Sequence, residues 1–237
     1  MTRILVMVPT YNECDNVEII ADRIRRSVPS ANLLFIDDNS PDGTGRILDK
    51  LALTDAHILV THRPRKMGIG SAHLLAILKA YSENYSILVT LDADLTHSPE
   101  NIHTMISNLK TADVATSSRF LNRSDLAGWN LRRKATTHLG HLLTQVLLGL
   151  PYDSSSGFRA YNLANIPKRC FELVRNSGYS FFFESLKILD MNKVSIVDVP
   201  MNLPPRTYGS SKMKLKDILS SVNILVIFAF KTKVNKK

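Results

Sequence analysis

The chain has 237 residues, of which 44% are hydrophobic and 22% are charged, so its composition is that of a globular protein and excludes a disordered chain. The net charge of +9 favours an anionic partner: nucleic acid, a membrane surface or a phosphorylated small molecule. The two cysteines, Cys14 and Cys170, have no metal-binding spacing and no disulfide framework, which is typical of a reducing compartment. The apolar run at 4–8 is too short for a signal-peptide core and indicates a buried strand instead.

Short apolar runs alternate with helical patterns through the first half of the chain. The runs predict strands at 4–8, 33–37, 57–61, 87–91 and 114–117. After the first run, Asp15 and Glu18 have the spacing of a capping box, and apolar residues at helical intervals continue to position 28. This alternation predicts an α/β fold, a Rossmann-like, doubly wound and mostly parallel sheet. In such sheets ligands bind beyond the carboxyl ends of the strands.

The second half is less regular. A helix near 131–150, a loop at 152–161, a strand near 194–199 and a terminal helix are predicted there. The helix near 131–150 has an apolar stripe that favours either a membrane interface or the core: Leu131, Ala135, Leu139, Leu142, Val146 and Leu150.

The terminal helix also has an apolar stripe, which widens toward its end. The run at 218–230 is 13 residues, about 20 Å of helix, and is too short to cross about 30 Å of hydrocarbon. A basic tail follows it, of the kind that binds an anionic surface. The helix either docks on a membrane or a small membrane subunit, packs on the core, or precedes a spanning region that this chain lacks.

Polar motifs follow the predicted strands. Asp37 and Asp38 end the second strand, where they could accept hydrogen bonds from ribose or a base, and Thr44 has the position of a cap for the next helix. In the third loop, basic residues precede Gly68 and Gly70 at a helix start, which is a pattern suited to phosphate. The spacing lacks the third glycine of a dinucleotide fingerprint.

The fourth predicted strand ends in Asp92-Ala93-Asp94, and Ser98-Pro99-Glu100 then has the pattern of a helix start. Two hard carboxylates leave room for water and phosphate oxygens, which is how Mg²⁺ or Mn²⁺ binds at nucleotide sites. Alone, this Asp-x-Asp pair fits a polar loop as well as a metal site. Four consecutive strand ends with turn, acid or phosphate-loop chemistry favour one shared cleft.

Eight motifs in order carry a resemblance to a known family: PTYNE, DDNSPDGT, KMGIGSA, DADLTHSPE, SSRF, GWNLRRK, SGFRAY and RTYGSSK. Together they resemble the dolichyl-phosphate mannosyltransferases, which are inverting glycosyltransferases of the GT-A class acting on polyprenyl phosphates. The resemblance extends from residue 4 to about 216, and the closest likeness is to short catalytic subunits without membrane spans. It implies transfer of a sugar, typically mannose from GDP-mannose, to a dolichyl or other polyprenyl phosphate.

The resemblance also implies roles for individual residues. The nucleotide sugar would be held by Pro9, Tyr11, Glu13, Asp38, Lys66, Gly68, Asp92, Ala93, Asp94, Arg206 and Lys212, with Asp92 and Asp94 binding the divalent cation, Mg²⁺ or Mn²⁺. The acceptor phosphate would be held by Arg119, Arg133 and Thr137. Catalysis would depend on Asp94, Arg119, Arg133 and Arg206. Thr96 stands where many relatives have a Gln that is a proposed metal ligand, so a third protein ligand is not established.

Residues 1–214 are therefore expected to form the catalytic domain, with a nucleotide-binding half to about 120 and an acceptor half from about 121, followed by an amphipathic helix and basic tail at 215–237. The expected location is the cytoplasmic face of a membrane, as a peripheral protein that small membrane-anchoring subunits would help to hold. Two alternatives stay open: transfer of another sugar such as glucose or N-acetylhexosamine, and a nucleotide- or nucleic-acid-binding protein. Nucleic acid is disfavoured as a partner because no aromatic residues interleave with the basic clusters.

Overall fold

The computed structural model describes residues 2–121, 131–202, 204 and 215–234. A seven-stranded sheet has the order β3-β2-β1-β4-β6-β5-β7. Its strands are β1 (Ile4–Thr10), β2 (Asn32–Asp37), β3 (Ile58–His62), β4 (Ile87–Thr90), β5 (Val114–Ser118), β6 (Arg159–Asn162) and β7 (Ile196–Pro200). All neighbouring pairs are parallel except those of β6, which runs antiparallel to β4 and β5. The prediction of a mostly parallel α/β sheet is confirmed.

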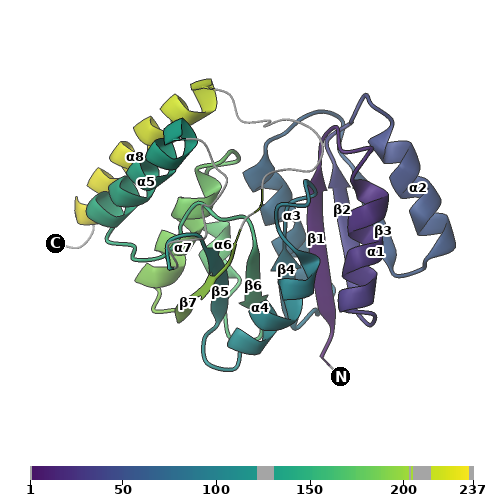
Figure 1. Ribbon diagram of the computed structural model, residues 1–237. Helices are drawn as coiled ribbons and strands as arrows, with labels where there is room; N and C mark the ends of the chain where they lie inside the picture. The colour runs from purple at the N-terminus through teal and green to yellow at the C-terminus, as the bar shows by residue number, and fades with distance from the viewer. Residues whose placement is uncertain (1, 122–130, 203, 205–214, 235–237) are drawn as a thin grey trace.

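Helices cover both faces of this sheet (Figure 1). On one face lie α1 (Val17–Ser27), α2 (Thr44–Thr54), a 3₁₀ turn (Pro99–Asn101) and α4 (Ile102–Asn108). On the other lie α3 (Ile69–Ser82), α6 (Arg169–Glu172) and α7 (Phe181–Met191), together with the end of α5 (Leu131–Leu148) and the middle of α8 (Leu215–Val234). Along β1, Leu5 and Met7 pack into one core and Val6 and Val8 into the other. A strand buried on both faces reads as a continuous apolar run, which is why the sequence located it.

Several local predictions differ from the structure. The segment at 159–162 is strand β6 and not part of a loop. The first helix begins at Val17 after Asn16, and no side-chain bond caps it, so the capping box at Asp15 and Glu18 is wrong. Thr44 is the first residue of α2 rather than its cap; its backbone N–H and its hydroxyl both donate to Asp42 Oδ1, at 3.0 and 2.6 Å.

Helices α5 and α8 lie side by side at the end of the sheet beyond β7 (Figure 1). The predicted stripe of α5 faces outward: Leu139, Leu142 and Val146 are more than half exposed, and of the stripe only Leu150 is buried. The alternative that placed this stripe in the core is therefore wrong. The apolar residues of α8 fall into two groups, because Leu225 and Ala229 are buried whereas six others are exposed: Ile218, Leu219, Val222, Val226, Ile227 and Phe230. Among the described residues, no helix has both the length and the apolar character needed to cross a membrane.

Candidate active site

A cavity of about 550 Å³ opens at the carboxyl edge of the parallel strands. Nine residues that the sequence singled out line it: Pro9, Tyr11, Glu13, Asp38, Lys66, Gly68, Asp92, Ala93 and Asp94. They come from the ends of β1, β2 and β4 and from the loop before α3, so the predicted convergence of strand ends is a property of the fold.

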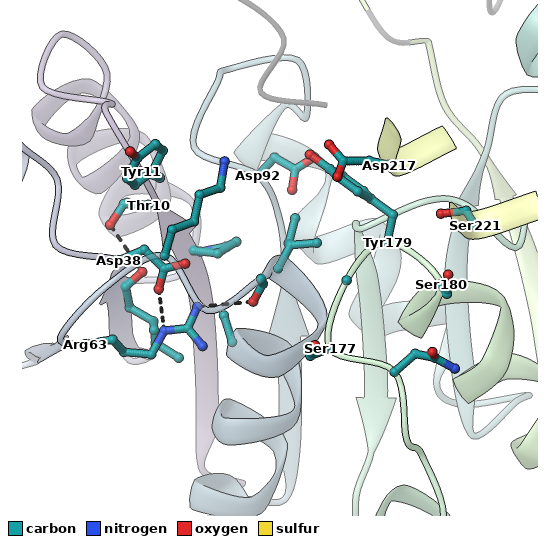
Figure 2. A pocket seen from close by; sticks show the side chains of 18 of the residues that line it. Thr10, Tyr11, Asp38, Arg63, Asp92, Ser177, Tyr179, Ser180, Asp217 and Ser221 are labelled. Carbon is teal, nitrogen blue, oxygen red and sulfur yellow. Dashed lines mark hydrogen bonds and ion pairs between the residues drawn. The ribbon is translucent and has the colours of Figure 1, made fainter. Parts of the chain in front are cut away.

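One end of the cavity is organised by an ion pair between Asp38 and Arg63, both buried (Figure 2). The guanidinium of Arg63 also donates to Ser71 Oγ at 2.6 Å and to the Gly68 carbonyl at 3.2 Å. The second carboxylate oxygen of Asp38 accepts the backbone N–H of Met67 at 3.2 Å. Asp38 therefore fixes the loop before α3 that leads into Gly68 and Gly70, which we call the glycine loop, and it also borders the cavity. Arg63 was missed, because a single basic residue in a loop gives no signal of its buried partner.

Asp37 has a different position from Asp38. It is buried, does not line the cavity, and accepts hydrogen bonds from the hydroxyls of Thr10 and Ser40 and from the Ser40 N–H. Of the two possibilities that the sequence left for Asp37, the structure favours the local one, since its carboxylate organises its own turn. Beside Asp38, the Lys66 ammonium lies 4.5 Å from the centroid of the Tyr11 ring. This cation–π contact joins an aromatic face and a positive charge at the same end of the cavity.

The two carboxylates of the Asp-x-Asp motif both line the cavity. The backbone N–H of Asp92 donates to His97 Nδ1 at 3.3 Å, so that nitrogen of the buried His97 is the acceptor. The Asp92 side chain lies against Gly157: a Cβ there would be 3.2 Å from Asp92 Oδ1. Gly157 reaches this position because β6 is antiparallel and its amino end meets the carboxyl end of β4.

Thr96 orients Asp94. Its hydroxyl and its backbone N–H donate to Asp94 Oδ1, at 2.6 and 3.1 Å. Leu95, between them, has a φ of 61°, a conformation that costs a non-glycine residue about 1–2 kcal/mol. The Thr96 hydroxyl is thus directed at the carboxylate, which is the role of a positioning group.

Asp92 and Asp94 have the chemistry to hold a divalent cation whose remaining ligands come from water and a substrate. Among the described residues, no cluster of three or more His, Cys, Asp or Glu side chains could hold a metal ion. Asp92 and Asp94 both line the cavity, and Asp94 is held by Thr96 in one orientation. Two oriented carboxylates leave most of an octahedral shell to water and to diphosphate oxygens, which is the usual binding mode of Mg²⁺.

The far end of the cavity was not predicted. It is formed by residues 176–180 and by five residues of α8: Lys216, Asp217, Ser220, Ser221 and Ile224. The 176–180 loop is held against the glycine loop, where the Ser71 N–H donates to the Ser177 carbonyl at 2.9 Å. A Cβ at Gly68 would lie 2.5 Å from that carbonyl oxygen. Gly68 and Gly70 therefore allow the two loops to pack in direct contact. This contact explains the two glycines that the sequence analysis interpreted as a phosphate-binding pattern.

Arg119 lies outside this cavity, at the end of β5, in a buried fork with Asp153. Its Nε and Nη2 donate to the two oxygens of Asp153, both at 2.8 Å, and its backbone N–H donates at 3.2 Å. Burial alone would raise the pKa of Asp153, but the charge and hydrogen bonds of Arg119 lower it below its ordinary value. Arg119 is therefore positioned by a carboxylate that stays ionised.

A chain of aromatic contacts leads from Arg119 to α5. The Arg119 guanidinium lies 5.6 Å from the Phe120 ring, which stacks on His141 at 3.8 Å between centroids. Thr137, one helical turn before His141, is part of the same helix and does not line the cavity. Arg206, Lys212 and the side chain of Arg133 lie outside the described residues.

Arg159, the first residue of β6, has its guanidinium bound inside the protein. It is fully buried, and donates to Ser185 Oγ at 3.0 Å and to the Phe182 and Ser154 carbonyls at 2.8 and 3.2 Å. Glu184 accepts the backbone N–H groups of Arg175 and Asn176, at 3.1 and 2.9 Å. Both residues therefore support the loops around the cavity.

Comparison with known proteins identifies the family. Residues 5–172 match glycosyl transferase family 2. The chain belongs to this family. It is 35% identical over 219 residues to a polyprenol monophosphomannose synthase of Mycolicibacterium smegmatis, covering 91% of this chain and 83% of the relative. It is 33% identical over 213 residues to an undecaprenyl-phosphate mannosyltransferase of Micrococcus luteus, covering 89% and 87%.

Solved structures support the fold of this glycosyltransferase. A mycobacterial protein matches with a TM-score of 0.67 at 20% identity, over 97% of this chain and 73% of that one. A mannosyltransferase from Pyrobaculum calidifontis, solved in complex with GDP-Man and Mn²⁺, matches with a TM-score of 0.54 at 18% identity, over 87% and 58%. The GT-A-like architecture expected from the sequence is confirmed.

Proposed function

We propose that this glycosyltransferase moves mannose from GDP-mannose to the phosphate of a polyprenyl lipid, with inversion at the sugar carbon. The observation that carries the proposal is the convergence of the nine cavity residues named above around Asp92 and Asp94. The two relatives at 33–35% identity, both named for mannose transfer to such lipids, support the choice of sugar and acceptor.

The donor would occupy the cavity with its nucleoside beside Tyr11 and Asp38 and its diphosphate at Asp92 and Asp94. A divalent cation, Mg²⁺ or Mn²⁺, would be held there by the two aspartates and would neutralise the diphosphate as leaving group. Thr96 keeps Asp94 oriented, and the Lys66 ammonium adds positive charge at the nucleotide end. These groups stabilise charge that develops as the bond from the sugar C1 to the diphosphate oxygen breaks.

The acceptor requires little acid–base chemistry. A phosphate monoester is ionised near neutral pH, so one of its oxygens can attack the sugar C1 directly as the diphosphate leaves from the opposite face. The obstacle is to bring two anions together, which a forked guanidinium addresses by bidentate contact with phosphate. Arg119 is the described candidate for a phosphate contact; because Asp153 occupies its Nε and Nη2, that contact would be made through Nη1. Arg133, Thr137, Arg206 and Lys212 remain predicted contributors.

A lipid acceptor also requires access to a membrane. The adjacent helices α5 and α8 together expose ten large apolar residues: Leu131, Leu139, Leu142, Val146, Ile218, Leu219, Val222, Val226, Ile227 and Phe230. Exposed apolar residues gathered on two adjacent helices are typical of a surface that binds a membrane or another protein. We infer that this surface rests on a membrane as a peripheral contact. The cytoplasmic face and an anchoring subunit stay predictions.

The decisive experiment supplies the purified protein with radiolabelled GDP-mannose, Mg²⁺ or Mn²⁺, and a short polyprenyl phosphate in anionic vesicles. We expect label to become extractable into organic solvent. GDP-glucose, UDP-glucose and UDP-N-acetylglucosamine, tested in parallel, would reveal a different donor. If no donor labels the lipid, although the protein is folded and bound to vesicles, the proposal fails.

Asp94→Asn provides the matched variant. The amide keeps an oxygen for the Thr96 hydroxyl but loses the charge, so we expect transfer to fall by at least about 10²-fold while the melting temperature changes little. Asp22→Asn is the control, because Asp22 forms only an exposed ion pair on α1. Full activity of the Asp94 variant would exclude the metal assignment.

A further inference from the structure

The cavity has two chemically different ends, and Asp92 lies between them (Figure 2). Figure 2 shows Tyr11, Asp38 and Arg63 on one side, and Tyr179, Asp217 and Ser221 on the other. In a nucleotide sugar the diphosphate separates the nucleoside from the sugar. If the diphosphate lies at Asp92 and Asp94 and the nucleoside beside Tyr11, the sugar must point toward the other end.

The described residues of the far end have the chemistry of a polyol site. They include the hydroxyls of Tyr179, Ser220 and Ser221 and the carboxylate of Asp217, with the ammonium of Lys216 also in the lining. Hydroxyls donate and accept, and a carboxylate accepts from two sugar hydroxyls at once. In Figure 2 the Tyr179 and Asp217 side chains point toward Asp92, where the diphosphate would lie.

The loop that carries Tyr179 is fixed from two directions. Glu184, buried at the start of α7, accepts the Arg175 and Asn176 backbone N–H groups and the Asn176 amide. The glycine loop packs against the loop's other side, where a Cβ at Gly70 would lie 2.6 Å from the Gly178 carbonyl oxygen. Two independent anchors therefore place Tyr179, and a site that is already in place loses little entropy on binding.

The α8 residues are fixed as well. Leu225 and Ala229, 4% and 3% exposed, dock the middle of the helix on the core. Asp217, Ser221 and Ile224 follow at helical spacing on the face that lines the cavity. The first two turns of α8 are thus a wall of the cavity rather than a separate appendage.

We propose that Tyr179, Asp217 and Ser221 form the subsite for the donor sugar, and that α8 therefore sets the sugar selectivity of this enzyme. The proposal rests on the proposed function of the same cavity. It assigns to α8, which also contributes the apolar outer surface, a direct contact with the transferred group.

The test compares binding of the nucleotide alone with binding of the nucleotide sugar. Calorimetry with Mg²⁺ gives the Kd values of GDP and of GDP-mannose for the wild type, Asp217→Asn and Ser221→Ala. A lost hydrogen bond to a charged group corresponds to a loss of roughly 10-fold or more. We expect Asp217→Asn to weaken GDP-mannose by about that factor, and Ser221→Ala by about 3-fold, while the Kd of GDP stays within 2-fold. Asn223→Ala, exposed on the outer side of α8, is the matched control and should change neither.

A second readout uses the ratio of kcat/KM for GDP-mannose to that for GDP-glucose, which should fall in Asp217→Asn. If both variants bind GDP-mannose like the wild type, the sugar subsite lies elsewhere and the proposal is overturned. Equal losses for GDP and GDP-mannose would also overturn it, because α8 would then shape the whole cavity. Failure of the wild type to bind any nucleotide would refute the proposed function itself. Binding of UDP instead of GDP leaves the comparison intact with UDP and its sugars.

Discussion

The buried fork between Arg119 and Asp153 allows a quantitative prediction for Asp153→Asn. The Asp153 side chain is 1% exposed and that of Arg119 is 13% exposed. Removing the charge of one partner from such a pair leaves the other uncompensated, at a cost of about 3–5 kcal/mol. The Asn keeps one oxygen as acceptor, so we expect the lower end, about 3 kcal/mol. For a chain of this length that corresponds to a loss of about 6–12 °C in melting temperature.

Urea unfolding gives the free energy, and kinetics separate the two substrates. If Asp153 positions Arg119 for the acceptor phosphate, the KM for polyprenyl phosphate should rise about 10-fold while the KM for GDP-mannose stays within 2-fold. Glu172→Gln is the control, because its pair with Lys168 is about half exposed on both sides and should contribute less than about 1 kcal/mol. A loss below about 1 kcal/mol in Asp153→Asn would refute the buried pair. An unchanged acceptor KM would refute the positioning role.

Two further variants test the packing and the electrostatics around the site. Gly70→Ala places a Cβ 2.4 Å from Phe181 Cβ, so we expect the free energy of unfolding, measured in urea, to fall by about 1–3 kcal/mol. Gly140→Ala is the control: a Cβ there has nothing within 4 Å, so the free energy of unfolding should rise by about 0.5–1 kcal/mol. Equal effects of the two substitutions would contradict the close approach at Gly70. Burial and the charge of Asp153 raise the pKa of Asp198 from 3.8 to about 6, so its contribution to stability is present below about pH 4 and is lost as the pH rises through 6. We therefore compare the melting temperature of Asp198→Asn with that of the wild type at two pH values. The difference in favour of the variant should be about 2–4 °C larger at pH 7.5 than at pH 4.5. A difference that does not depend on pH would argue against the raised pKa of Asp198.

The parallel strands were predictable because burial on both faces leaves an unbroken apolar run, as in β1 and β2. Strand β6 was not predicted, because it has only four residues and begins with the charged Arg159. The partners that let this arginine be buried, Ser185 and the Phe182 carbonyl, lie more than 20 residues away in the chain. Local sequence contains no information on such a pairing, so a charged residue in a short apolar segment is read as a loop.

The near half of the site was predictable for a topological reason. Residues that follow parallel strands meet at one edge of the sheet, so the positions of Tyr11, Asp38 and Asp94 follow once the strands are located. Side-chain partners were not predictable in the same way. The sequence gives no reason to distinguish Asp37 from Asp38. Because successive side chains of a strand point to opposite faces, Asp37 accepts hydrogen bonds within its own turn, whereas Asp38 forms an ion pair with Arg63.

Helix α8 shows why the far half of the site could not be read from hydropathy. An amphipathic helix has one apolar stripe. The stripe of α8 widens after residue 222, which suggested only that the end of the helix is more apolar. The structure shows three environments on one helix: Asp217 and Ser221 at the cavity, Leu225 and Ala229 in the core, and Leu219 and Val226 exposed. Because 3.6 residues complete a turn, each environment recurs at three- or four-residue intervals, and the three patterns overlap within 13 residues. The short polar face is therefore hidden among apolar residues, although it is the face that would meet the donor sugar.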